Sequence, residues 1–164
     1  MKKLYVVRHA KSSWSNNLLS DYERPLEKSG INDTNQIGHY LRSKQYIPDC
    51  VLTSAAVRTI QTTDILYKYF SKNTVEIIKL ESLYGASVEE TINIIKNFNN
   101  KYNSLMVVGH NPTITLMINQ ISSAVIDHVP TSGVAVIDLN SIKDNNLIAG
   151  KLLEFIYPKK LKIV

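Results

Sequence analysis

The sequence predicts an α/β fold of three layers, in which helices cover both faces of a mostly parallel central sheet. Short, continuous apolar runs alternate with helix-length amphipathic segments, as expected of buried parallel strands joined by helical crossovers. The last two apolar runs have no helix-length segment between them, so this final pair can be antiparallel. With 164 residues, of which 44% are hydrophobic, the chain is expected to form a single domain over residues 1–164.

The first half of the chain alternates strands with helices around one long loop. Residues 9–30 are polar and contain Pro25 and Gly30, and a loop of this length is often functional. Ser54 is expected to act as the N-cap of the second helix, which places Arg58 in or near its first turn. The expected elements are strands at 4–8, 51–53 and 75–80 and helices at 32–45 and 55–70.

The second half continues the alternation and ends with two strands. Ser87 and Glu90 have the spacing of a capping box and predict a helix from residue 88. Asn111 is expected to cap the next helix, with Pro112 in its first position. The expected strands are at 105–108, 134–139 and 147–156, the helix after Pro112 extends to residue 120, and an Asn/Asp-rich turn joins the last two strands.

Composition favours a cytoplasmic protein with neither a nucleic-acid nor a membrane partner. The net charge is +5, but the basic residues are scattered, without the basic stripe and interleaved aromatics of a nucleic-acid surface. No apolar run approaches the roughly 18 residues that a membrane span requires. Two N-terminal lysines precede only four apolar residues, which are too few for a signal-peptide core. Cys50 is the single cysteine and cannot form an internal disulfide.

Arginine is used selectively in this chain. The sequence has four arginines among its 19 basic side chains, so lysine supplies most of the surface charge. Arginine presents a planar fork that binds two phosphate oxygens at once, which lysine cannot do. Arg8, Arg24 and Arg58 fall at loop or junction positions, whereas Arg42 lies on a predicted helix face. The first three are therefore candidate phosphate ligands.

Two histidines follow predicted strands in the same way as the arginines. Arg8 and His9 end the first strand, Arg58 follows the second, and His110 follows the strand at 105–108. Because ligands bind at the carboxyl ends of parallel strands, these segments are expected to meet at one edge of the sheet. Helix N-termini at that edge add N–H donors for an anion. The pattern predicts a phosphoryl pocket around a nucleophilic imidazole.

The expected chemistry begins at His9. A neutral imidazole can attack phosphorus and give a phosphohistidine, which divides hydrolysis into two steps. Arg8, Arg58 and a protonated His110 would stabilise the phosphoryl oxygens. The four histidines, His9, His39, His110 and His128, show no metal-ligand spacing. We therefore expect neither a metal nor another cofactor.

The residues alone do not decide which acid is the proton donor or whether Arg24 and the nearby serines contact the phosphate. A phosphomonoester needs an acid for its leaving oxygen, and Glu81 and Asp21 are both candidates. A phosphohistidine or phosphoramidate needs less help, because imidazole leaves easily once protonated. Arg24 either reaches the phosphate or clamps an acid. The hydroxyls of residues 12–15, including Ser12 and Ser15, either donate to phosphate or stabilise turns.

Four motifs together resemble the histidine phosphatase superfamily, whose signature is Arg-His-Gly at the end of the first strand. They are Arg8-His9-Ala10, the loop Arg24-Pro25-Leu26 with Gly30, the segment from Ser54 through Arg58-Thr59, and Gly109-His110-Asn111-Pro112. The small size, the Arg-Pro-Leu loop and Leu83-Tyr84-Gly85 are similar to the SixA-type phosphohistidine phosphatases. Ala10 stands in place of the signature glycine and is expected to fit if its φ is negative.

The resemblance implies roles for these residues. His9 would be the nucleophile, Arg8, Arg58 and His110 would bind the phosphoryl group, Arg24 would add a substrate contact, and Glu81 would be the proton donor. The stretch between the second arginine and the second histidine is too short for the helices that cover the site in mutases. An open site suits phosphohistidine in a protein. A small phosphomonoester, such as a sugar or nucleoside phosphate, and a non-catalytic phosphoprotein-docking module are the alternatives.

Overall fold

The computed structural model describes residues 1–70, 75–139 and 150–162, and six strands in these residues form one sheet. The strand order is β3-β2-β4-β1-β5-β6. The strands are β1 (Lys3–Arg8), β2 (Cys50–Ser54), β3 (Glu76–Leu80), β4 (Ser104–Gly109), β5 (Val134–Asp138) and β6 (Lys151–Ile156). β1, β4, β2 and β3 are parallel, while β5 is antiparallel to both β1 and β6. The expected α/β fold and the antiparallel final pair are confirmed.

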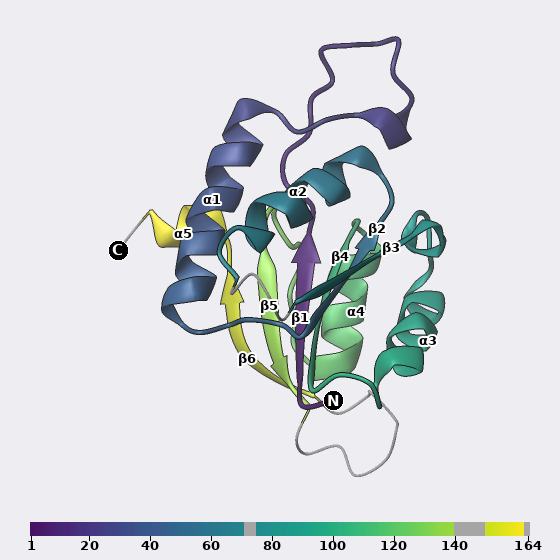
Figure 1. Ribbon diagram of the computed structural model, residues 1–164, viewed down its shortest axis with the longest axis vertical. Coiled ribbons are helices and arrows are strands. Elements are labelled where there is room, and N and C mark those ends of the chain that lie inside the picture. Colours follow the sequence, from purple (N-terminus) through teal and green to yellow (C-terminus); the bar gives the residue numbers. More distant parts are fainter. Residues whose placement is uncertain (71–74, 140–149, 163–164) are drawn as a thin grey trace.

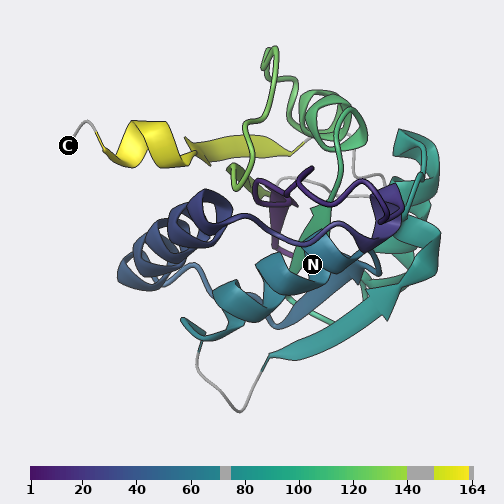
Figure 2. The same cartoon turned by 90° about the horizontal axis from the view of Figure 1, so that it is seen from above.

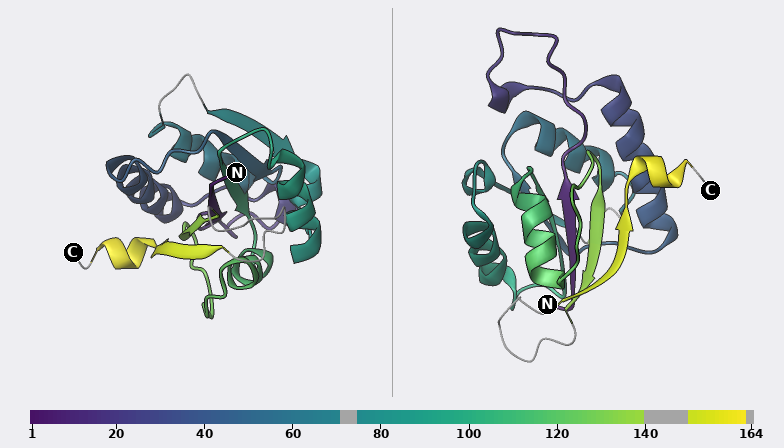
Figure 3. Two further views of the ribbon diagram at one scale, coloured as in Figure 1. Left: turned by 90° about the horizontal axis from the view of Figure 1, so that it is seen from below. Right: turned by 180° about the vertical axis from the view of Figure 1, so that it is seen from behind.

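Helices cover both faces of this sheet, as Figures 2 and 3 show. They are α1 (Lys28–Ser43), α2 (Val57–Tyr67), α3 (Val88–Phe98), α4 (Thr113–Ser122) and the short α5 (Pro158–Leu161). Alternate residues of β1 explain the two cores. Leu4 and Val6 pack with the apolar side chains of α3 and α4, whereas Tyr5 and Val7 pack with those of α1 and α2.

The first helix begins at Lys28, earlier than the expected residue 32. Its third residue explains the difference. Gly30 lies so close to the segment after β1 that a Cβ there would be 2.3 Å from the carbonyl oxygen of Lys11. Only glycine permits this approach. The helix is thereby held against the chain that carries the first histidine motif, and the loop before it is shorter than expected.

Two of the three predicted helix caps are wrong. Ser54 stays in β2, and Ala56 is the N-cap of α2, without a side-chain bond. Helix α4 begins at Thr113, with Pro112 rather than Asn111 at the cap. The third prediction is confirmed: Ser87 and Glu90 form the capping box of α3. Helix α5 was not predicted from the sequence. The Asn/Asp-rich turn expected between the last two strands lies outside the described residues, as do residues 147–149, where the last strand was expected to begin.

Candidate active site

Three adjacent strands bring the predicted motifs together at the carboxyl edge of the sheet. β2, β4 and β1 are neighbours, and the loop after β1 rises above their ends (Figure 1). His9 follows β1 and His110 follows β4, and their ring centroids are 5.2 Å apart. Arg58, from the first turn of α2, donates toward a ring nitrogen of each histidine. The chain therefore places one buried guanidinium against two imidazoles.

His9 is held with one ring nitrogen free to react. Its Nδ1 lies 2.7 Å from the carbonyl oxygen of Ala10, which can only accept, so the proton is on Nδ1. Nε2 lies 3.3 Å from Nε of Arg58, which can only donate, so Nε2 carries the lone pair. Burial, with the nearby charge of Arg58, lowers the pKa of His9 to about 3 despite the bond to Ala10. The imidazole is neutral at physiological pH.

Arg58 uses its two edges for different partners. The Nε and Nη2 edge faces His9 and His110, at 3.3 and 3.2 Å. The Nη1 and Nη2 edge faces Asp21, with Nη1 donating to its carbonyl oxygen and Nη2 to its carboxylate at 3.0 Å. The side chain is only 6% exposed. Asp21 thus fixes the outer edge of the guanidinium and leaves the inner edge directed at the histidines.

His110 is also neutral, which differs from the protonated form expected from the sequence. Its Nδ1 accepts from Arg58, so the ring proton is on Nε2, which donates to Oγ of Ser54 at 2.8 Å. Burial and then the charge of Arg58 lower the pKa of His110 to about 4. The ring of Tyr84 packs edge-on against that of His110, with the ring centroids 5.5 Å apart.

Arg8 is anchored by the loop that precedes β5. Its Nη1 donates to the carbonyl oxygen of Val129 and contacts Nε2 of His128, both at 2.9 Å. Its Nε is buried and has no partner among the described residues. No sequence motif links His128 to Arg8, which lies 120 residues away in the chain.

Arg24 clamps an acid, which is one of its two predicted alternatives, and it also lines a cavity beside His9. Its Nη1 donates to the Asp21 carboxylate at 3.0 Å, Nε to the carbonyl oxygen of Ser13 at 3.0 Å, and Nη2 to Oγ of Ser12 at 2.7 Å. The ring of Trp14 lies 3.2 Å from Cζ of Arg24. Every nitrogen of this guanidinium is engaged by its own loop, so Arg24 organises the loop around the site.

The remaining predicted residues occupy different positions. Ser12 lines a cavity of about 320 Å³ together with Arg8, His9 and Arg58. Ser15 is exposed, bonds to Ser13, and is absent from the residues that line this cavity. The structure therefore gives no support for a substrate contact by Ser15.

Glu81 reaches the site only through aromatic rings. Both oxygens of its carboxylate accept from the hydroxyl of Tyr22, at 2.8 Å. Tyr22 packs against Tyr84, and Tyr84 packs against His110. Tyr84 belongs to the Leu83-Tyr84-Gly85 motif, but no role was predicted for it, and no local spacing connects Tyr22 with Glu81 59 residues later.

Asp21 is an anion and a poor proton donor. Burial raises its pKa, but bonds from Tyr84, Arg24 and Arg58 outweigh that effect and lower the pKa to about 2. The carboxylate is therefore ionised at neutral pH. The Glu81 carboxylate, the other acid that the sequence offered, is bonded to Tyr22.

Three further expectations concerned Ala10, a metal ion and a membrane span. The backbone of Ala10 is outside the left-handed region, so its methyl group fits the signature position. Among the described residues, no three His, Cys, Asp or Glu side chains gather as ligands for a metal ion. No helix in the same part of the chain has the length and apolarity to cross a membrane.

The two neutral histidines predict that stability falls on acidification. An unfolded histidine takes up a proton near pH 6.5, but folding lowers the pKa of His9 to about 3 and that of His110 to about 4. Between about pH 4 and 6.5 the unfolded chain binds more protons, so the free energy of unfolding decreases as the pH falls. We expect His9→Gln to have a smaller decrease in Tm than the unaltered protein between about pH 6.5 and 4.5. An equal or larger decrease would contradict the buried neutral state.

Phosphoryl hydrolysis through a histidine is the chemistry for which this edge of the sheet is arranged. Residues 4–88 match the model of the histidine phosphatase superfamily (branch 1), and the chain belongs to that superfamily. An uncharacterized protein of Mycobacterium tuberculosis is 32% identical over 146 residues, covering 80% of this chain and 85% of that protein.

Solved structures agree in fold. The putative phosphohistidine phosphatase SixA from Agrobacterium tumefaciens is similar with a TM-score of 0.83 and 29% identity, covering 96% of this chain and 98% of that chain. The protein histidine phosphatase SixA complexed with tungstate has a TM-score of 0.81 at 20% identity, covering 97% and 99%. The second comparison shows the shared fold alone. The protein is thus an enzyme of the superfamily that acts on phosphorylated substrates.

Proposed function

We propose that this phosphatase hydrolyses phosphohistidine in proteins, with His9 as the covalent nucleophile. The observation that carries the mechanism is the bond from Nδ1 of His9 to Ala10, which leaves the lone pair of Nε2 facing Arg58. The similarity to the putative phosphohistidine phosphatase SixA extends over 96% of the chain and supports the substrate class. The cavity of about 320 Å³ beside His9 would receive the phosphoryl group.

The first step transfers the phosphoryl group to the enzyme. The lone pair on Nε2 of His9 attacks phosphorus in line, and the bond from phosphorus to the leaving imidazole breaks with its electron pair remaining on that ring nitrogen. A protonated substrate imidazole then leaves as a neutral group. Arg8 and the inner edge of Arg58 receive the phosphoryl oxygens, and His110 donates to them once it has gained a proton.

The second step returns the enzyme to its starting form. A water oxygen attacks phosphorus, and the bond to Nε2 of His9 breaks with its electron pair returning to that nitrogen. The water proton passes to a base, for which Glu81 is the candidate carboxylate, and this proton and the one that His110 gained are then released to solvent. The products are inorganic phosphate and the neutral His9.

The placement of the acids supports a nitrogen-linked substrate over a phosphomonoester. An alcohol leaving group needs a proton donor at its oxygen. Asp21 is held ionised by two arginines, and Glu81 is bonded to Tyr22. An imidazole that is already protonated in the substrate needs neither acid, because it departs as a neutral group.

A substrate panel tests the proposal. Turnover of a phosphohistidine protein, of phosphoramidate, of p-nitrophenyl phosphate and of a sugar phosphate is compared by kcat/KM, with and without a chelator. We expect the two nitrogen-linked substrates to be preferred, and the chelator to have no effect. Preference for the sugar phosphate would favour the small phosphomonoester alternative. Phosphate binding without any turnover would favour the docking module.

The carboxylate that holds Arg58 gives a separate prediction. Asp21→Asn removes the charge from the outer edge of Arg58 while keeping the shape of the side chain. A guanidinium held less firmly should lower kcat/KM by about tenfold, because small displacements of binding groups are costly in the transition state. Phosphoramidate hydrolysis measures the effect. Asp33→Asn, which breaks a distant ion pair with Lys162, is the matched control. If Asp21 instead competed with the phosphoryl group, its removal would raise kcat/KM.

A further inference from the structure

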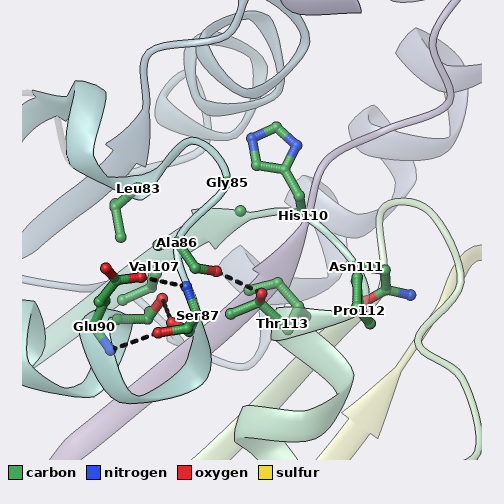
Figure 4. A pocket seen from close by; sticks show the side chains of 13 residues that line it. Leu83, Gly85, Ala86, Ser87, Glu90, Val107, His110, Asn111, Pro112 and Thr113 are labelled. Carbon is green, nitrogen blue, oxygen red and sulfur yellow. Dashed lines mark hydrogen bonds between the residues drawn. The ribbon is translucent and has the colours of Figure 1, made fainter.

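A second cavity adjoins the phosphoryl site at His110. It has a volume of about 380 Å³ and lies between the turn that precedes α3 and the turn that precedes α4 (Figure 4). Gly109 and His110 form one side of it, so the residue that faces Arg58 and His9 also borders this cavity. Among the described residues, the two cavities have no lining residue in common, but His110 connects them through its contacts with Arg58 and His9.

The lining of this second cavity is largely aliphatic, and the Glu90 carboxylate and Asn111 amide that also line it are bonded within the protein. Leu83, Ala86, Val107 and Ile114 supply aliphatic surface. The hydroxyl groups around them are already bonded within the protein. Ser87 accepts from the backbone of Glu90, Thr91 donates to the carbonyl oxygen of Ser87, and Thr113 donates to that of Ala86. Figure 4 shows the capping box and the bond from Thr113 as dashed lines.

This hydrogen bonding decides which ligand fits. A polar group entering the cavity would lose water without finding a free hydroxyl, and burying an unpaired polar group is unfavourable. An apolar group would exchange water for aliphatic contacts. The wall at His110 also places the ligand close to the phosphoryl group, since the rings of His9 and His110 are 5.2 Å apart.

We infer that this cavity is a specificity subsite for an apolar side chain of the protein substrate, one or two residues from the phosphorylated histidine. Successive Cα atoms of an extended chain are about 3.8 Å apart, so a neighbouring side chain can reach past His110. The inference rests on the proposed function, because it requires a polypeptide substrate. It adds a sequence preference that the phosphoryl pocket itself does not supply.

Peptides with one phosphohistidine test the subsite. In a serine-rich peptide, leucine is placed in turn at each of the two positions on either side of the phosphohistidine. We expect at least one leucine position to raise kcat/KM roughly tenfold over the all-serine peptide, because discrimination by an apolar pocket is commonly of this size. Phosphoramidate, whose leaving group is ammonia, is measured in parallel as a substrate that cannot occupy the second cavity.

The second part of the experiment uses a variant in which a larger side chain fills the cavity. Ala86→Leu should reduce the ratio of kcat/KM between the best leucine peptide and the serine peptide to about one. Ala124→Leu adds the same group outside the lining residues and should keep the ratio of the unaltered protein. The peptide series with the unaltered protein tests the subsite even if Ala86→Leu fails to fold.

The outcomes separate the two proposals. Turnover of phosphoramidate without a preference for leucine at any position overturns the subsite and leaves the proposed function in place. A preference that survives in folded Ala86→Leu also overturns it. No turnover of either phosphoramidate or phosphohistidine peptide overturns the proposed function, and the subsite with it.

Discussion

Replacing His9 with alanine is expected to abolish turnover. The variant loses the ring nitrogen whose lone pair faces Arg58, and no other described side chain occupies that position. Loss of a covalent nucleophile lowers kcat by roughly 10⁴-fold or more. Hydrolysis of phosphoramidate measures the effect, and a labelled phosphoryl group should be trapped on the unaltered protein in an acid-labile bond and be absent from His9→Ala.

The control for this variant is another histidine. His39→Ala makes the same change on α1, where the ring packs against Tyr69 rather than against the site. It should keep the turnover of the unaltered protein. His9→Ala should still bind inorganic phosphate, because Arg8, Arg58 and His110 remain. Full hydrolytic activity of His9→Ala would show that the covalent mechanism is wrong.

Local sequence patterns predicted the parts of this site that follow directly from strand ends. The apolar runs before His9 and His110 identify buried parallel strands, and parallel strands bring their carboxyl ends to one edge. Arg8 ends β1, and His9 and His110 directly follow β1 and β4, so their convergence needs only the topology. The same reasoning predicted that Arg58, in the first turn of α2, lies at this edge.

The contacts that hold these groups could not be predicted in that way. Asp21 meets Arg58 across 37 residues and Tyr84 across 63, and His128 meets Arg8 across 120. These partners come from irregular loops, where no periodicity indicates the direction of a side chain. The assignment of Ser54 as a helix cap failed for a related reason. Its hydroxyl accepts from the backbone of Ala56, before the helix begins, and it also lies within hydrogen-bonding distance of His110, which follows the next strand of the sheet.

The protonation states follow from those long-range contacts. A sequence predicts only that a histidine near phosphate should be protonated, whereas burial beside Arg58 lowers the pKa of His110 to about 4. The same guanidinium contributes to lowering the pKa of Asp21 to about 2. Burial and the charge of Arg58 together keep two imidazoles neutral, and Arg58 is one of three groups that hold the Asp21 carboxylate charged before substrate binds. Arg58 is therefore the charge that acts on all three groups.

Replacing Arg58 with lysine should accordingly have the second-largest effect. Lysine keeps the positive charge but lacks the planar fork, so it cannot face both histidines with one edge and Asp21 with the other. We expect kcat/KM for phosphoramidate to fall by about 10²–10³-fold, the size seen when one preorganised oxyanion donor is lost. Inhibition by tungstate, a tetrahedral oxyanion, should weaken in parallel.

The comparison with Arg42→Lys separates geometry from charge. Arg42 is exposed near the end of α1, and the same substitution there should leave kcat/KM unchanged. Because Arg58 is buried, thermal unfolding of Arg58→Lys must accompany the kinetics, and only the folded variant is informative. If folded Arg58→Lys retained kcat/KM within a few-fold of the unaltered protein, a point charge would suffice. The division of one guanidinium between an inner, phosphoryl-facing edge and an outer, Asp21-facing edge would then have no part in catalysis.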